Sequence, residues 1–158
     1  MYEKQFMDLA VEVAYEGINK GCGGPFGCVI VKDGEVIAKA HNTVVGDNDP
    51  TAHGEMNAIR QAGKVLGNFN LEGCELYTTS EPCPMCLSAI MWARIRKVYS
   101  GLEIEDAAVI GFDDKPFYEE IFQYAVDKDI NLVDVEFHRE KNCKELFRKY
   151  DNMEKVLY

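Results

Sequence analysis

Basic residues are scarce in this sequence. Its 158 residues include 17 lysines and arginines against 27 aspartates and glutamates, so the formal net charge at pH 7 is −10. Such a chain repels a phosphate backbone unless a local basic patch outweighs the total. The compact basic cluster Arg94-Ile95-Arg96-Lys97 has the form of a solvated helix end. We therefore expect no nucleic-acid partner.

Long apolar runs are also missing. No uncharged apolar stretch approaches the ~20 residues that a membrane-spanning helix needs. Residues 1–20 are interrupted by charges and lack the apolar core of a signal peptide. We expect a cytoplasmic protein with no membrane partner, whose six cysteines are thiols or metal ligands. Four of them suit small buried apolar positions: Cys22, Cys28, Cys74 and Cys143.

Internal repeats and low-complexity tracts are absent as well. A chain of 158 residues with 47% hydrophobic content suits one globular core and leaves little room for a second. The sequence therefore predicts a single domain over residues 1–158.

The chain does contain a Cys-x-x-Cys pair, Cys83 and Cys86, downstream of His53. Three such ligands are the set that a catalytic zinc takes when its fourth position is left for water. A structural zinc site would close with a fourth ligand, but His41, His138 and the other cysteines do not stand at paired-ligand spacing. The pattern favours an open catalytic site. A structural zinc site and, for the cysteines alone, a redox pair are the other interpretations.

Glu55 stands two residues after His53. This spacing does not easily allow both side chains to bind the same ion, so the carboxyl is free to carry protons. His-x-Glu followed by Pro-Cys-x-x-Cys is the pattern of the zinc-dependent nucleobase deaminases. The sequence therefore predicts a deaminase-type catalytic site.

The N-terminal third predicts a helix followed by a β-hairpin. Apolar residues recur at helical spacing over residues 6–18, with acidic residues on the other side. Residues 26–32 and 35–41 are two β-rich runs, and Asp33-Gly34 between them is a dipeptide favoured in tight hairpin turns. Asn42 then opens a polar loop.

Each half of the motif, His53 with Glu55 and Cys83 with Cys86, is predicted to lie at the start of a helix. We expect one helix to start near Asp49-Pro50-Thr51, with Thr51 or Asp49 as its cap. Residues two apart on a helix point in different directions, so His53 and Glu55 share a site only if it lies off the helix N-terminus. The next helix carries Cys83 and Cys86 in its first turn. The positive helix ends favour thiolate over thiol there.

The remaining elements complete an α/β pattern. Further strands are predicted over 75–79, 97–101 and 132–137, with a short helix through Tyr124 and an amphipathic C-terminal helix. A hairpin followed by strands that alternate with helices implies a mixed sheet of about five strands in a three-layer α/β/α arrangement. The working crevice of such a sheet lies at the carboxyl ends of the strands.

Over nearly its whole length the sequence resembles the cytidine deaminase superfamily, and within it the guanine deaminase branch. The matching segments are Gly24-Pro25-Phe26-Gly27, Asn48-Asp49-Pro50-Thr51-Ala52-His53, Glu81-Pro82-Cys83-Pro84-Met85-Cys86, Trp92-Ala93-Arg94, Gly111-Phe112-Asp113-Asp114 and the C-terminal Tyr158. The resemblance implies a three-layer domain with one Zn²⁺ per chain. It further implies a homodimer in which the C-terminal segment, about residues 140–158, is swapped between the chains.

The resemblance also implies roles for particular residues. His53, Cys83 and Cys86 would be the zinc ligands and Glu55 the proton shuttle. Asp114 would act with them as a second catalytic group, binding or relaying a proton to the exocyclic amine.

Five further residues would contact the substrate. Asn42 would hold the purine edge, Phe26 would pack on its face, and the backbone N–H of Gly54 would meet a ring carbonyl. Trp92 would line the pocket, and Tyr158 would cap it from the other chain.

Position 54 departs from the branch pattern, because guanine deaminases commonly carry Ala there. His-Gly-Glu is closer to fungal cytosine deaminases. The backbone donor survives, but we expect the pocket floor to lose a methyl group and so to gain room for a different base.

The expected activity is zinc-dependent hydrolytic deamination of a free nucleobase, with guanine giving xanthine and ammonia. Alternatives of the same chemistry are deamination of another base, of the cytosine or isocytosine type, and of adenosine in tRNA. A zinc-stabilised binding module without turnover is the alternative from another class.

Overall fold

The computed structural model describes residues 1–127 and residue 144. By its internal contacts the chain divides into two compact units, Met1–Lys115 and Pro116–Tyr158. The residues around the candidate metal site all belong to the first unit. The predicted single domain over 1–158 stays a prediction.

The first unit contains the predicted hairpin. Strands β1 (Gly27–Lys32) and β2 (Glu35–His41) pair antiparallel. Asp33 and Gly34 between them both have positive φ, at 51° and 81°. These are the backbone conformations that the tight Asp-Gly turn requires, so the prediction of a hairpin is confirmed.

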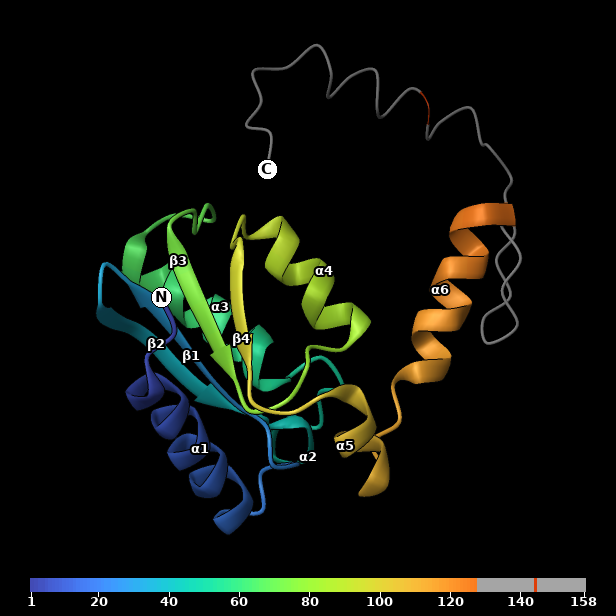
Figure 1. The fold of residues 1–158 in the computed structure, drawn as a ribbon, viewed down its shortest axis with the longest axis horizontal. Helices are drawn as coiled ribbons and strands as arrows, with labels where there is room; N and C mark the ends of the chain where they lie inside the picture. Colours follow the sequence, from blue (N-terminus) through green and yellow to red (C-terminus); the bar gives the residue numbers. More distant parts are fainter. Residues whose placement is uncertain (128–143, 145–158) are drawn as a thin grey trace. The chain divides into compact units, whose positions relative to one another are not determined.

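The hairpin is part of a mixed sheet. Strand β3 (Cys74–Thr78) pairs antiparallel with β1, and β4 (Lys97–Ser100) pairs parallel with β3. The order is β2-β1-β3-β4 (Figure 1). The part of the chain that the structure describes thus holds four strands where about five were predicted, and the predicted strand 132–137 lies outside that part.

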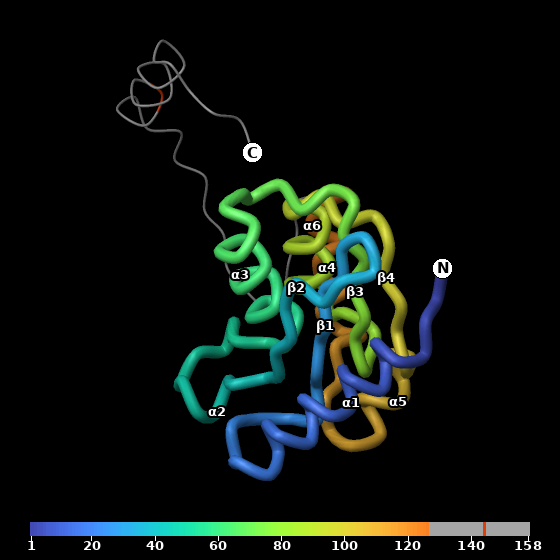
Figure 2. The backbone as a smooth tube through the Cα atoms, turned by 90° about the vertical axis from the view of Figure 1, so that its left-hand side faces the viewer, coloured from blue at the N-terminus to red at the C-terminus, as the bar shows by residue number. Residues whose placement is uncertain are grey.

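Helices cover both faces of the sheet, as the predicted three-layer arrangement requires. Helix α1 (Lys4–Asn19) packs on one face, and α3 (Gly54–Leu66) and α4 (Pro84–Trp92) pack on the other. The turned view in Figure 2 shows α3 on one side of the strands and the N-terminal residues that lead into α1 on the other.

Alternation along β1 assigns its side chains to the two layers. Val29 and Val31 belong to a buried cluster with Phe6, Met7 and Ala10 of α1. Cys28 and Ile30 face the opposite layer, where they join the buried side chains Ala58, Ala62, Leu76 and Ile90. A strand buried on both faces fixes the sheet between the helices, so the N-termini of α3 and α4 are held in place.

The helix that carries Glu55 begins later than predicted. Its N-cap is His53 and its first residue is Gly54, whereas a cap at Asp49 or Thr51 was expected. The physical reason is that Asp49 Oδ1 accepts hydrogen bonds from the N–H and the hydroxyl of Thr51, both at 2.8 Å. Asp49 therefore closes a local turn and does not cap a helix. The predicted polar loop also contains a short helix, α2 (Val44–Asp47).

Two more helices follow the sheet. Helix α5 (Ile104–Val109) was not predicted, and its start is held by the N–H of Glu103, which donates to Asp106 Oδ2 at 2.9 Å. Helix α6 (Lys115–Asp127) corresponds to the short helix predicted through Tyr124. The predicted C-terminal helix lies outside the described residues. Among the helices of the described residues, none has the length and apolar character to cross a membrane.

Candidate metal centre and pocket

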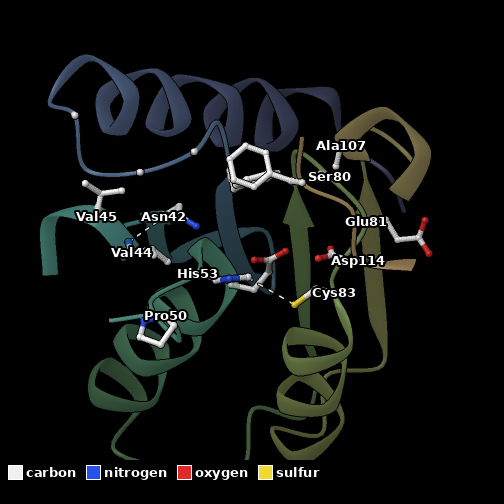
Figure 3. A pocket seen from close by; sticks show the side chains of 16 residues that line it. Asn42, Val44, Val45, Pro50, His53, Ser80, Glu81, Cys83, Ala107 and Asp114 are labelled. Carbon is white, nitrogen blue, oxygen red and sulfur yellow. Dashed lines mark hydrogen bonds between the residues drawn. The ribbon is translucent and has the colours of Figure 1, made fainter. Parts of the chain in front are cut away.

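The three predicted zinc ligands converge from two helix N-termini. His53 is the N-cap of α3, Cys83 is the N-cap of α4, and Cys86 lies in the first turn of α4. Pro84 between the cysteines occupies the first helical position, where a missing N–H costs no hydrogen bond. Figure 3 shows His53 and Cys83 at the adjoining ends of their helices. The prediction that the site lies off the helix ends is confirmed.

The separations of the donor atoms fit a zinc ion. His53 Nδ1 lies 3.6 Å from Cys83 Sγ and 3.5 Å from Cys86 Sγ, and all three donor atoms lie within 4.8 Å of one another. A nitrogen and a sulfur bound to one zinc at ordinary distances and a tetrahedral angle are about 3.6 Å apart. One imidazole and two cysteines in this geometry can therefore hold Zn²⁺ and leave one position of the tetrahedron for water.

A hydrogen bond between the two cysteine side chains moves their pKa values apart. A hydrogen bond from Cys86, together with the neighbouring His53, lowers the pKa of Cys83 to about 4. The pKa of Cys86 is raised, because its thiol donates a hydrogen bond to Cys83 and its sulfur is buried. Zinc binding as two thiolates must displace this last proton, so metal affinity increases with pH.

Glu55 lies in the first turn of α3, beside the metal residues. Only 5% of its surface is exposed. Oε1 accepts a hydrogen bond from the hydroxyl of Thr78 at 3.0 Å, while Oε2 lies 3.5 Å from Cys86 Sγ. Burial raises the pKa of the carboxyl above its ordinary value. The arrangement places a buried carboxyl beside the candidate metal ligands.

A cavity of about 400 Å³ opens over the metal residues and Glu55. This volume lies in the range of small-molecule sites. Its wall is largely apolar, and Phe26 meets Phe112 edge to face with ring centroids 5.0 Å apart. The remaining apolar lining comes from Val44, Val45, Pro50 and Ala107. Such a slot suits a flat heteroaromatic ring.

Asn42 and Asp114 bring polar groups to this cavity. The buried Asn42 accepts a hydrogen bond from the N–H of Val44 on Oδ1, at 3.1 Å. Figure 3 shows its side-chain nitrogen turned toward the cavity, where it can donate to a ligand. Asp114 lines the same cavity, and burial together with the negative charge of Cys83 raises its pKa.

The structure corrects the expectation for Gly54. A Cβ atom at this residue would lie 2.9 Å from the carbonyl oxygen of Phe26 and 3.6 Å from the backbone nitrogen of Asn42. These two backbone groups are hydrogen-bonded to each other at 2.8 Å. The absent methyl therefore points at the backbone link between Phe26 and Asn42 and does not enlarge the cavity floor. Because Gly54 has no side chain, α3 can approach the backbone hydrogen bond between Phe26 and Asn42 closely.

The structure does not bear out one predicted substrate contact and does not describe another. Trp92 is the last residue of α4, at the opposite end from the metal ligands, and 60% of its surface is exposed. Tyr158 lies outside the described residues. Both roles stay predictions.

Sequence reasoning missed three residues that the fold brings to the site. Phe112 occurs in a matching segment but had no assigned role, whereas here it forms a wall of the cavity. Ser80, which is buried, also lines the cavity. Thr78 contacts Glu55 directly. Thr78 could have been noticed in the sequence, because it carries a hydroxyl at the end of the strand that leads into the cysteine motif.

The comparisons with known proteins agree with this geometry. The family model for the cytidine and deoxycytidylate deaminase zinc-binding region matches residues 1–102. Guanine deaminase from Bacillus subtilis is 48% identical over 152 residues, which are 96% of this chain and 97% of that protein. A crystal structure of guanine deaminase from Bacillus subtilis, 47% identical, covers 99% of this chain and 100% of that one with a TM-score of 0.85.

A second group of relatives is similar over less of the chain. The tRNA-specific adenosine deaminase of Aquifex aeolicus is 46% identical over 111 residues, which are 70% of this chain and 73% of that protein. The guanine deaminase therefore matches a larger share of this chain than the tRNA-specific adenosine deaminase does. By its fold, its metal-ligand geometry and this match over most of its length, the chain belongs to the cytidine and deoxycytidylate deaminase family.

Proposed function

We propose that this protein is a zinc-dependent aminohydrolase that converts guanine and water to xanthine and ammonia, a step of purine breakdown. The observation that carries the proposal is the buried carboxyl of Glu55 between the His53, Cys83 and Cys86 cluster and a cavity of about 400 Å³. The choice of guanine is supported by the similarity to a guanine deaminase over nearly the whole length of both chains.

Proton transfer is the role we assign to Glu55. Zinc held by His53, Cys83 and Cys86 would supply a Lewis acid that lowers the pKa of a water in the fourth position. Glu55 accepts the proton of the attacking water on Oε2, because Oε1 is engaged by Thr78. It donates that proton to the ring nitrogen next to C2, takes the remaining proton from the hydroxyl that has added to C2, and passes it to the departing amine, which leaves as ammonia.

The cavity residues would orient the base so that C2 faces Glu55. Asn42 donates from its side-chain nitrogen to an acceptor on the purine edge, and Phe26 packs on the ring. The amide of Gly54 is the first of α3, a position without an intrahelical acceptor, so it can donate to a ring carbonyl. Asp114 would accept a hydrogen bond from the exocyclic amine. Its raised pKa also lets it carry a proton.

A screen for ammonia release tests the proposal. Purified zinc-loaded protein is incubated with guanine, cytosine, adenine, isocytosine and their nucleosides. We expect turnover of guanine, with xanthine as the product and one ammonia released per base. If cytosine or isocytosine is turned over in place of guanine, the proposed substrate would be wrong and the proposed hydrolytic deamination would stand. No ammonia from any of these compounds would overturn the proposal.

Deamination of adenosine in tRNA is the second candidate, because tRNA-specific adenosine deaminases are 46% and 42% identical over 70% and 63% of this chain. The net charge of −10 opposes binding of a polyanion. A shift assay with tRNA at low and moderate salt separates the two functions. Salt-sensitive binding together with inosine formation would favour the second candidate.

We further propose that the active form is a homodimer in which the C-terminal segment, about residues 140–158, crosses to the partner and places Tyr158 over the base. Support comes from large apolar side chains that the single chain leaves exposed at the end of α4 and in α5: Met91, Trp92, Val109 and Ile110. Exposed apolar side chains of this size are typical of interfaces. An interface at α4 would also give Trp92 a route to a substrate pocket.

Complementation between two inactive variants tests the exchange. Glu55→Ala lacks the shuttle and Tyr158→Ala lacks the cap, so each homodimer should be impaired. If the segment is swapped, a mixed dimer has one site with both residues intact, and an equal mixture should recover about a quarter of the wild-type activity. If each chain caps its own site, co-expression should restore nothing.

A further inference from the structure

Thr78 carries a buried hydroxyl next to the carboxyl of Glu55. It is the last residue of β3, and 1% of its surface is exposed. Its Oγ1 lies 3.0 Å from Glu55 Oε1 and 3.1 Å from the carbonyl oxygen of Ser80. The hydroxyl therefore has two acceptors within reach and a single hydrogen to donate.

The carboxyl oxygen is the stronger acceptor of the two, so we assign the hydrogen of Thr78 to Oε1. At 5% exposure Glu55 has little water to replace this bond. The other carboxylate oxygen, Oε2, is then turned toward the metal ligands, where it lies 3.5 Å from Cys86 Sγ.

The backbone of Thr78 is held on two sides. Within the sheet the residue is paired with Cys28 of β1 and Ser100 of β4, and its carbonyl accepts from the N–H of Gly101 at 2.9 Å. A donor on a central strand has little freedom to follow a moving acceptor. The position of the carboxyl on α3 is thus tied to the sheet through one side-chain hydrogen bond.

We infer that Thr78 is a positioning residue, whose hydroxyl holds the carboxyl of Glu55 so that Oε2 faces the attacking water and the substrate amine. The inference rests on the proposed role of Glu55 as proton carrier. Thr78 touches neither the substrate nor the metal ligands in this assignment, and it acts through Glu55.

The chain offers a matched pair of substitutions to test this. Thr78→Val replaces the hydroxyl with a methyl group of similar size. Thr79→Val makes the same change one residue later, where the hydroxyl bonds only backbone groups, namely the N–H of Gly27 at 3.1 Å and the carbonyl of Pro25 at 3.2 Å. Thr78→Ser keeps the hydroxyl and removes the methyl group.

Steady-state kinetics on the zinc-loaded full-length protein should separate these variants. For Thr78→Val we expect kcat to fall about 10- to 100-fold with KM within about twofold of wild type. The zinc content should stay at one per chain. Thr78→Ser should restore most of kcat, and Thr79→Val should retain it. Unchanged kcat in Thr78→Val, an equal loss in Thr79→Val, or loss of zinc from Thr78→Val would each overturn the inference.

A measurement that needs no activity distinguishes this inference from the proposed function. The unfolding midpoints of Thr78→Val, Glu55→Ala and the double variant form a cycle on the zinc-loaded protein. If the hydroxyl bonds the carboxyl, the double variant should lose less stability than the sum of the single losses. Additive losses would show that the two side chains do not interact. The cycle stays informative even if wild type releases ammonia from no base.

Discussion

His53 Nδ1 lies 3.5 Å from Cys86 Sγ, although the two residues are 33 positions apart in the chain. Each is held by the start of a different helix, α3 or α4, and both helices pack on the same face of the sheet. The metal geometry is therefore a property of the fold, since the spacing of residues within either half of the motif does not fix it. Substitutions that keep the fold and remove one donor should isolate the contribution of the metal.

Cys86→Ser should lose zinc. A serine hydroxyl is a much poorer zinc ligand than a thiolate, so we expect the affinity to fall by about 100-fold or more. Metal analysis after dialysis against a mild chelator measures this loss. Cys74→Ser is the matched control, because Cys74 is also buried but belongs to the core cluster away from the metal ligands. It should lower the unfolding midpoint and keep one zinc per chain. If Cys86→Ser retained stoichiometric zinc, the ligand assignment would be wrong.

The local features of this fold could be predicted from the sequence. Asp33-Gly34 predicts the hairpin because only a few residue types tolerate the two positive φ angles of its turn. Cys83 and Pro84 predict a helix start because proline suits the first helical position. The ligand set His53, Cys83 and Cys86 followed from ligand chemistry and spacing.

Three features could not be predicted. Asp49 looked like a helix cap, but its side chain bonds Thr51 and closes a local turn, which the same residue types also allow. The missing methyl at Gly54 looked like extra cavity space, but its direction is set by where the helix meets Phe26. The contact from Thr78 to Glu55 depends on the strand order and on the packing of α3. Spacing along the chain carries no information about the last two, because they depend on tertiary contacts.

Glu55→Gln should separate chemistry from folding. Glutamine has the same shape and can still accept a hydrogen bond from Thr78, but it cannot take a proton from water. We expect zinc content near wild type, an unfolding midpoint no lower than that of wild type, and a fall in kcat of about 100-fold or more. Ammonia release and metal analysis on the same preparation measure the two effects. Retention of even a tenth of the wild-type turnover would refute the proton-carrying role.

Gly54→Ala should weaken substrate binding. The new methyl group would press on the carbonyl of Phe26, and the backbone link to Asn42 must shift by a few tenths of an ångström to make room. Both residues are proposed substrate contacts, so we expect KM for the preferred base to rise about fivefold, with zinc retained. The ratio of kcat/KM between guanine and cytosine measures any change in selectivity.

A second glycine of the same helix provides the control for this experiment. A Cβ at Gly63 would meet only the carbonyl of Asn68, at an ordinary distance of 3.5 Å. Alanine is favoured over glycine inside a helix by roughly 0.5–1 kcal/mol, so Gly63→Ala should leave KM unchanged and raise the unfolding midpoint slightly. Equal KM values for the two variants would show that the contact between Gly54 and Phe26 does not affect the site.

The stability of the metal-free protein should fall as the pH rises through the titration of Glu55. Burial is the main cause that raises the pKa of this carboxyl above the ordinary value of 4.5. Between 4.5 and the raised pKa, the folded protein therefore holds a proton that the unfolded chain has lost. Because the folded state binds more protons in that window, the free energy of unfolding decreases with increasing pH there. Each unit of pKa difference contributes about 1.4 kcal/mol.

Glu55→Gln removes this titration and should flatten the pH dependence. Chemical denaturation of both metal-free proteins at intervals from pH 4.5 upward gives the difference in unfolding free energy at each pH. We expect the variant to become more stable relative to wild type as the pH rises, because wild type must place an ionised carboxyl in a site with little water. The gain should end once the pH exceeds the raised pKa. Parallel curves of unfolding free energy against pH would mean that Glu55 ionises as easily in the folded protein as in the unfolded chain. The proposed dry environment of Glu55 would then be wrong.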